Sequence, residues 1–151
     1  MSEAPKPGRR ARPRRPRDAS RLRGSVVLHV DARGRARLRH DGGTRVTRRT
    51  AVARGAVAMS RAAFEALAEG RLAKGDALAV ARLAGIQAAK RTSEIVPLCP
   101  PLSLESVEVD VDLDGKRAEA VVTATARITG KTGVEMEALT AVAAACLALY
   151  D

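Results

Sequence analysis

The sequence predicts an α+β protein in which helices pack on one face of an antiparallel sheet. Residues 106–129 alternate apolar and polar side chains in two runs separated by a turn, which is typical of a half-buried hairpin. Residues 60–91 and 132–151 instead repeat apolar side chains at helical spacing. In each segment, a residue type that commonly caps helices precedes the repeat. The resulting order of strands, two helices, a hairpin and a last helix favours helices layered on one sheet.

Residues 1–24 are predicted to form a disordered basic tail, and residues 25–151 the one folded domain. The tail holds nine of the 27 Lys and Arg residues, against two acidic residues, so seven of the ten net positive charges belong to it. With almost no large apolar side chain, it cannot offset the entropy cost of ordering. We interpret the tail as a solubilising or weakly RNA-attracting extension, because no aromatic residue is interleaved for base stacking.

The first part of the domain is predicted to be extended. Residues 26–31 and 36–39 flank a short polar loop and indicate a hairpin. Residues 44–59 carry β-branched side chains with little regularity and are also predicted to form a strand. His40 lies between these segments, and we interpret it as a surface turn residue rather than a catalytic base.

Two capped helices follow. Ser60 can cap a short helix through Glu69, and Gly70 then occupies the position that a left-handed residue usually fills. Asp76 can cap a second helix, which is predicted to end near Arg91. The apolar face of this second helix consists of Leu78, Ala81, Ala84 or Gly85, and Ala88.

In the predicted hairpin, one side of each strand is apolar. The first strand presents Val107, Val109, Val111 and Leu113 on that side, and the returning strand presents Ala118, Ala120, Val122, Ala124, Ala126 and Ile128. Asp114-Gly115 between them matches a two-residue type I′ turn.

The last helix is predicted to begin with a capping box formed by Thr132 and Glu135. Its core stripe is predicted to be Met136, Leu139, Ala143, Cys146 or Leu147, and Tyr150. On this interpretation Glu137 lies on the opposite side of the helix, either as an ordinary solvated glutamate or as a functional residue.

Composition limits the classes of function. Phe64 and Tyr150 are the only aromatic residues, so the core must be built from small aliphatic side chains. Cys99 and Cys146 are too few for a disulfide framework and lack zinc-ligand spacing, which predicts no metal site and a cytoplasmic location. The sequence shows neither a secretory signal nor an apolar run long enough to span a bilayer.

Several longer stretches identify the family that the chain resembles. They are Lys74-Gly-Asp76, Gly85-Ile-Gln-Ala-Ala-Lys-Arg-Thr92, Pro97-Leu-Cys99 and Gly130-Lys-Thr-Gly-Val-Glu-Met-Glu-Ala-Leu-Thr140. From about His29 to Asp151 the chain resembles the MoaC family of cyclic pyranopterin monophosphate synthases, which act in molybdenum cofactor biosynthesis. The resemblance implies a ferredoxin-like arrangement and a homo-oligomer, a hexamer built from dimers, with sites between paired subunits.

The resemblance also implies a reaction and its residues. Relatives convert (8S)-3',8-cyclo-7,8-dihydroguanosine 5'-triphosphate to cyclic pyranopterin monophosphate and pyrophosphate. Matched positions make Lys74 and Asp151 the expected proton-transfer residues, and Leu98, Cys99, Pro100, Met136 and Glu137 the expected substrate contacts. Lys90, Arg91 and Lys131 are expected to bind phosphate, because a triphosphate needs several cations. No cofactor is predicted; magnesium is expected only as a companion of the triphosphate.

Asp151 and Glu137 cannot touch one small reacting centre if the last helix is straight. Asp151 follows Glu137 by 14 residues, which brings it to about the same helix face but roughly 21 Å further along. The helix could break, a long nucleotide could span both residues, or two subunits could each supply one residue. We favour the third arrangement.

The sequence departs from the family pattern at two places that bear on activity. Pro100 stands where the family pattern has a histidine that contacts substrate, and proline supplies no titratable ring. The sequence also stops at Asp151, before a further family lysine, the final helix turns and a last strand. A catalytically impaired or truncated homologue that only binds nucleotide is therefore an alternative, and a small RNA-associated α+β module is a more distant one.

Overall fold

The computed structural model describes residues 45–73 and 75–151. The chain divides into two units, residues 1–37 and 38–151, and every described residue belongs to the second. The predicted tail, the hairpin over residues 26–39, His40 and Lys74 lie outside the described residues. The boundary after residue 24 stays a prediction.

The described strands form one antiparallel sheet, which confirms the predicted α+β class. β1 spans Thr47–Ala58, β2 spans Ser106–Asp114 and β3 spans Glu119–Gly130. The strand order is β1-β3-β2, so β3 lies in the centre and pairs with both neighbours. One face of the sheet is apolar because the alternating residues of β2 and β3 that the sequence predicted to face inward are buried or half-buried.

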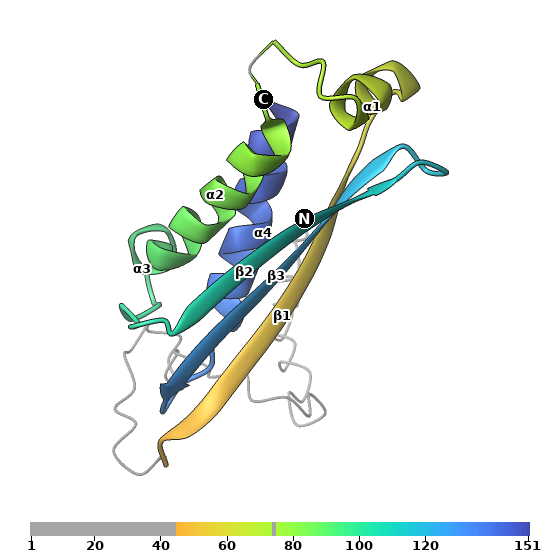
Figure 1. Ribbon diagram of the computed structural model, residues 1–151. Helices are drawn as coiled ribbons and strands as arrows, with labels where there is room; N and C mark the ends of the chain where they lie inside the picture. Colours follow the sequence, from red (N-terminus) through yellow and green to blue (C-terminus); the bar gives the residue numbers. More distant parts are fainter. Residues whose placement is uncertain (1–44, 74) are drawn as a thin grey trace, which may run out of the picture. The chain divides into compact units, whose positions relative to one another are not determined.

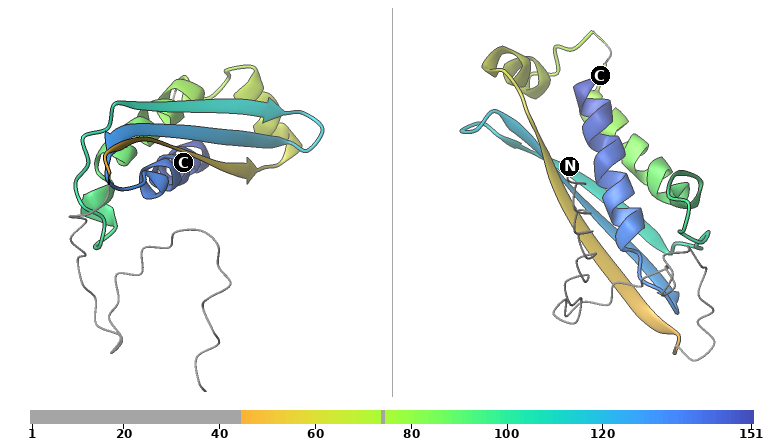
Figure 2. Two further views of the ribbon diagram at one scale, coloured as in Figure 1. Left: turned by 90° about the horizontal axis from the view of Figure 1, so that it is seen from below. Right: turned by 180° about the vertical axis from the view of Figure 1, so that it is seen from behind.

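Two long helices, α2 (Ala77–Lys90) and α4 (Glu135–Tyr150), cover the apolar face of this sheet (Figures 1 and 2). α4 contacts β1 and β3, whereas α2 contacts β2. The short helices α1 (Arg61–Ala68) and α3 (Thr92–Ile95) precede and follow α2. The order β-α-β-β-α matches the first five elements of a ferredoxin-like fold, with α1 and α3 as additions.

Local caps start the helices as the sequence predicted. The Ser60 hydroxyl accepts a hydrogen bond from the Ala63 amide at 3.2 Å, and the Asp76 carboxylate accepts one from the Ala79 amide at 2.9 Å. After α1, Gly70 adopts a φ of +64°, a conformation that glycine reaches without steric cost.

Small residues let the helices approach the sheet and each other closely. A Cβ atom at Gly85 of α2 would lie 2.9 Å from the Ala141 carbonyl oxygen of α4 and 3.1 Å from a Val109 methyl group of β2. A Cβ atom at Gly55 of β1 would lie 2.7 Å from a methyl group of Val142. Six alanines in this core are completely buried: Ala81, Ala120, Ala124, Ala126, Ala141 and Ala145. The predicted aliphatic core is therefore confirmed.

The outward face of α4 corrects the sequence interpretation. Met136, Leu139, Leu147 and Tyr150 are 38%, 51%, 69% and 85% exposed, and Ala143 between them is exposed as well. We call these five residues the outward stripe. The face packed on the sheet is the opposite one, with Glu137, Ala138, Ala141, Val142 and Ala145. The predicted core stripe was wrong because α4 is apolar on both sides, so spacing alone does not distinguish them.

The turn between β2 and β3 also differs from the prediction. The strands pair as far as Asp114 and Glu119, which leaves a four-residue loop instead of a two-residue type I′ turn. The Asp114 carboxylate accepts hydrogen bonds from the amides of Lys116 and Arg117, at 2.9 and 3.2 Å. This side-chain turn is a local alternative to the tighter hairpin, and the left-handed residue is Ala118, with φ 54°.

Candidate functional site

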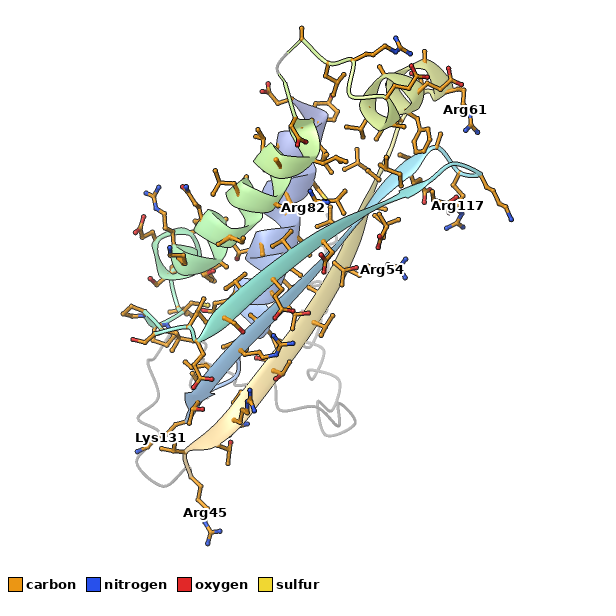
Figure 3. All side chains as sticks on the ribbon, in the orientation of Figure 1. Arg45, Arg54, Arg61, Arg82, Arg117 and Lys131 are labelled. Carbon is orange, nitrogen blue, oxygen red and sulfur yellow. The ribbon has the colours of Figure 1, made fainter. Side chains whose placement is uncertain are left out.

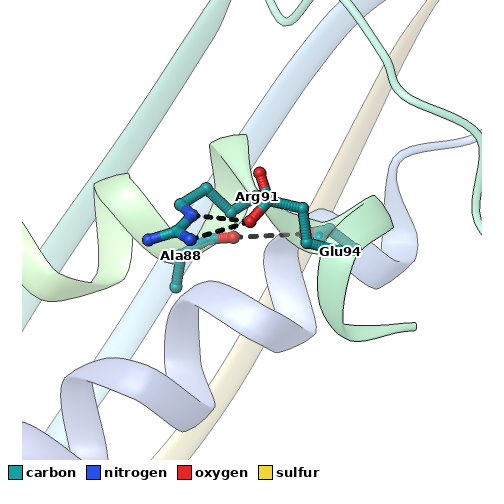
Figure 4. A network of polar contacts seen from close by, with 4 residues as sticks. Ala88, Arg91 and Glu94 are labelled. Atoms are coloured by element: carbon teal, nitrogen blue, oxygen red, sulfur yellow. Dashed lines mark hydrogen bonds and ion pairs between the residues drawn. The ribbon is translucent and has the colours of Figure 1, made fainter. Parts of the chain in front are cut away.

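The segment after α2 is held by contacts around α3. Thr92 is 1% exposed, and its hydroxyl donates to the carbonyl oxygen of Ala89 at 3.0 Å. Arg91 pairs with Glu94 through Nε at 2.9 Å and through a terminal nitrogen at 2.8 Å, and its amide donates to Ala88 (Figure 4). These bonds order the chain where α2 ends and α3 begins.

Cys99 lies within electrostatic reach of Glu137. The Cys99 amide donates to the Val96 carbonyl oxygen at 3.0 Å, which fixes this part of the loop. Burial raises the pKa of the half-buried Cys99 thiol, and the nearby Glu137 carboxylate raises that pKa further. A raised pKa keeps the thiol protonated at neutral pH, which makes Cys99 a poor nucleophile.

Glu137 is buried, which excludes the ordinary solvated glutamate that was one of the two expectations for it. It lies in the first turn of α4 and is 4% exposed. Burial raises the pKa of its carboxyl group; a hydrogen bond from its own backbone amide acts in the opposite direction, and Glu135 adds a further raising effect. A raised pKa brings a carboxyl group closer to the range in which it can act as a general acid or base.

The entry to α4 differs from the predicted capping box. The N-cap residue is Val134, and no side chain caps the helix. The Glu135 carboxylate instead folds back over Gly133, in space that a Cβ atom would occupy. Lys131 precedes this turn, is exposed, and lies with Arg45 near the end of the sheet where β1 begins (Figure 3).

α2 and α4 run antiparallel, so the predicted site residues separate into two groups. Gly85 packs on Ala141, which places the end of α2 beside the start of α4. Lys90 and Arg91 end α2, and Met136 and Glu137 begin α4, so these four predicted residues lie at this end of the helix pair, which we call the α3 end. Leu98, Cys99 and Pro100 follow α3 in the chain, and Lys131 precedes α4. Asp151 lies at the opposite end, beside the start of α2 (Figure 1). We call that second position the Asp151 end.

α4 is one unbroken helix from Glu135 to Tyr150, and the Asp151 amide still donates to the Leu147 carbonyl oxygen at 3.1 Å. The helix therefore keeps Glu137 and Asp151 roughly 21 Å apart along its axis. A break in the helix is excluded, and one chain cannot place both carboxyl groups on one small reacting centre. Lys74 immediately precedes Gly75 in the sequence, but it lies outside the described residues.

Arg49 was missed in the sequence and belongs among the candidate anion ligands. Its Nε is buried without a hydrogen-bond partner in the described structure. Arg49 pairs across the sheet with Ile128, on the same face as the pairs formed by Ala51 and Ala53. Side chains two positions apart in a strand lie on the same face, so Arg49, Ala51 and Ala53 share the face that the helices cover. The neighbouring arginines make this alternation of apolar and polar residues hard to recognise in the sequence.

An open pocket of about 460 Å³ lies beside the end of α2, but it is separate from the Cys99 and Glu137 pair. Its lining residues are Ala84, Gln87, Ala88, Arg91, Glu94 and Ile95. Within residues 45–73 and 75–151, no cluster of His, Cys, Asp and Glu could hold a metal ion. In the same ranges, no helix is long and apolar enough to cross a membrane.

Fold and site together define an α+β protein with a partly buried acid and thiol at one end of a helix pair and a second acid at the other. Residues 42–151 match the MoaC family. The chain belongs to this family.

The similar proteins have consistent names. A cyclic pyranopterin monophosphate synthase of Parvibaculum lavamentivorans is 52% identical over 125 residues, which cover 83% of this chain and 78% of the relative. The protein of that name in Heliobacterium modesticaldum is 53% identical over 125 residues, which cover 83% of this chain and 79% of the relative. Molybdenum cofactor biosynthesis protein 1 of Bos taurus is 52% identical over 125 residues, covering 83% of this chain and 20% of the relative.

Proposed function

We propose that this chain catalyses the reaction that gives its relatives their name. It forms cyclic pyranopterin monophosphate from (8S)-3',8-cyclo-7,8-dihydroguanosine 5'-triphosphate and releases pyrophosphate, in molybdenum cofactor biosynthesis. Relatives about half identical to the chain support this assignment. The observation that carries it is that Cys99 and buried Glu137, which lie 38 residues apart in the sequence, come within electrostatic reach of each other.

In this proposal the α3 end binds the substrate. Leu98 and Cys99 form one wall, and Met136 and Glu137 form the facing one. Burial raises the pKa of the Glu137 carboxyl group, so it can hold a proton against a ring nitrogen or hydroxyl group of the substrate. This use of Glu137 depends on the desolvated position that the first turn of α4 gives it.

Cations from neighbouring elements bind the triphosphate. Lys90 and Arg91 end α2, Lys131 precedes α4, and Arg49 carries a buried nitrogen that lacks a partner in the described structure. Arg91 already pairs with Glu94 at an exposed position, so phosphate would have to compete with that pair. Magnesium would accompany the triphosphate rather than occupy a protein cage.

Lys74 and Asp151 move protons during the rearrangement. We assign this role to Lys74 because it matches the position of a site lysine in the family pattern. We further propose a homo-oligomer, because Asp151 and Glu137 are too far apart in one chain. A cytoplasmic location also belongs to this proposal, supported by the two free thiols.

A second candidate function is nucleotide binding without turnover. Pro100 favours it, because the family pattern has a histidine there and proline offers neither a titratable ring nor an amide donor. This candidate predicts that substrate binds with no release of pyrophosphate. A Pro100→His variant would then gain activity, whereas an active wild-type chain needs no such repair.

The deciding experiment supplies purified chain with the cyclised triphosphate and measures both pyrophosphate and the pterin product. We expect release by the wild-type chain and about a 10²- to 10⁴-fold slower rate for Lys74→Ala, the range for loss of a general acid or base. Lys116→Ala, in the loop between β2 and β3, is the matched control and should keep full activity. Binding without release supports the second candidate function, and equal rates for wild type and Lys74→Ala contradict the assigned role of Lys74.

A further inference from the structure

The pocket beside the end of α2 has the size and composition of a small-molecule site. Its volume of about 460 Å³ lies within the range of roughly 300–1,000 Å³ that ligand pockets occupy. Its surface combines the apolar side chains of Ala84, Ala88 and Ile95 with the polar ones of Gln87, Arg91 and Glu94. An apolar surface with a few polar groups can both hold a small ligand and orient it.

Arg91 and Glu94 hold each other in one orientation at this pocket. Nε of Arg91 donates to Oε2 of Glu94 at 2.9 Å, and Nη2 lies 2.8 Å from the same oxygen (Figure 4). A guanidinium group has five N–H donors and a carboxylate has two acceptor oxygens, so this pair uses only part of its capacity. In the described part of the chain, no other group pairs with the remaining N–H donors or with Oε1 of Glu94. The ion pair therefore offers an N–H donor close to an oxygen acceptor.

This pattern matches a ligand whose edge carries a carbonyl oxygen next to an N–H group. The carbonyl oxygen can accept a hydrogen bond from Arg91, and the N–H group can donate one to Glu94. The 6-oxopurine ring, as in guanine, carries these two groups on one flat edge. Adenine carries an amino donor and a ring-nitrogen acceptor there, which would set donor against donor and acceptor against acceptor.

The remaining pocket residues suit a flat ring. Ala84 and Ala88 are neighbours on one face of α2, four residues apart, and present only methyl groups. A planar ring can therefore lie close to the helix surface. Ile95 adds a larger apolar contact, and the Gln87 amide adds one further donor group and one acceptor.

We propose that this pocket is a second ligand site, which binds a 6-oxopurine ring over Ala84 and Ala88 with its carbonyl and N–H groups against Arg91 and Glu94. The inference goes beyond the proposed function and does not depend on it. The ring leaves the ion pair intact, whereas phosphate would have to compete for Arg91. Because the side chains of the pair are 67% and 59% exposed, we expect weak binding, with a dissociation constant of about 0.1–1 mM.

The test titrates the full chain, with ¹³C-labelled Ala, Ile and Met methyl groups, with guanosine and follows the methyl NMR signals. Guanosine carries the 6-oxopurine ring and no phosphate. We expect saturable shifts at Ala84, Ala88 and Ile95, because an aromatic ring changes the magnetic field at adjacent methyl groups. Adenosine is the matched control ligand and should bind at least about tenfold more weakly, since its donor and acceptor are exchanged.

Two variants test the two parts of the pocket. Ala88→Leu fills the surface on which the ring lies and should abolish the guanosine shifts. Glu94→Ala leaves that surface open but removes the acceptor, so it should remove the preference for guanosine over adenosine. Glu65→Ala removes an exposed carboxylate of α1, outside the pocket lining, and should bind guanosine as wild type does. Unchanged amide spectra of the free variants away from the substituted residue show that each is folded.

Three results would overturn the proposal. Shifts at Met136 without shifts at Ala84 and Ala88 would place guanosine in the proposed substrate site instead. Equal affinities for guanosine and adenosine would exclude recognition by the ion pair, and shifts that do not saturate would exclude a site. None of these measurements involves pyrophosphate release, so the pocket and the proposed reaction can fail separately.

Discussion

The two faces of α4 are similarly apolar but differ in side-chain size. The face on the sheet carries mainly alanine, with Val142 and the buried Glu137, whereas the outward stripe carries Met, Leu and Tyr side chains. Burial energy scales with apolar area, so hydrophobicity alone would put the larger face inside. Because the face with the smaller side chains is the buried one, steric fit against the sheet and α2 decides which face of α4 points inward.

The fit is set by glycine positions on the neighbouring elements. Gly55 of β1 and Gly85 of α2 bring α4 so close that even a methyl group at either position would collide with it. Only alanine-sized side chains can occupy such contacts without displacing the helix. The small face is therefore used up by packing within the chain, and the large face stays exposed.

Enlarging the small face should give the greatest loss of stability. Ala145 is completely buried, so Ala145→Leu adds three carbon atoms to a filled space. We expect a loss of about 2–3 kcal/mol in the free energy of unfolding. Urea denaturation at fixed protein concentration should show a lower midpoint with an unchanged slope. Ala79→Leu, at an exposed position of α2, is the control; an equal loss there would mean that packing on α4 is not the cause.

A smaller change tests the closest helix contact. Gly85→Ala would normally stabilise a helix by about 1 kcal/mol, because alanine has the higher helix propensity. Here the added methyl group would lie 2.9 Å from the Ala141 carbonyl oxygen, and backbone cannot move aside easily. We expect a net loss of about 1–2 kcal/mol. Urea denaturation measures this change: a lower midpoint for Gly85→Ala is expected. A higher midpoint than that of wild type would mean that α2 and α4 do not pack as closely as described.

Local features of the fold were predictable from the sequence, and contacts between distant parts were not. Ser60 and Asp76 cap their helices through bonds to residues three positions away, so the sequence contains both partners. The alternation in β2 and β3 likewise predicts which side is buried. The loop after Asp114 escaped prediction because its carboxylate binds two loop amides, which competes with the tighter turn.

Only the family resemblance indicated which residues, distant from each other in the sequence, belong to the candidate site. Nothing in the local sequence brings Cys99 within reach of Glu137, and the periodicity of α4 placed Glu137 on the side opposite the predicted core stripe. Arg49 was missed because a strand next to several arginines looks solvated until its pairing with Ile128 is known. Burial of a charged group depends on the tertiary contacts around it, which composition and spacing do not contain.

The buried acid on the small face gives a pH-dependent effect. Because burial raises the pKa of Glu137 in the folded chain above its unfolded value, protonation favours folding. Its stabilising contribution is fully present below the ordinary Glu pKa of about 4.3 and is lost as the pH rises through the folded value. Glu137→Gln stays neutral, so it should be more stable than wild type at pH 7, by on the order of 1 kcal/mol.

Thermal unfolding from pH 4 to pH 8 measures this effect. The difference between Glu137→Gln and wild type should shrink towards zero as the pH falls. Glu105→Gln changes an exposed carboxylate and should track wild type throughout. A Glu137→Gln advantage that persists unchanged at pH 4 would mean that the substitution acts through packing and not through charge.

The smallest expected effect reports directly on the contact between the loop and α4. Burial and then the Glu137 carboxylate raise the pKa of the Cys99 thiol, so its alkylation by iodoacetamide should reach half of its maximal rate above the ordinary thiol pKa. In a Cys146→Ser background, only Cys99 reacts. Glu137→Gln removes the nearby charge and should move this midpoint to lower pH, while burial keeps it raised. An unmoved midpoint would place the carboxylate too far from the thiol for the two to share a site, and the α3 end would then lose the contact on which its assignment depends.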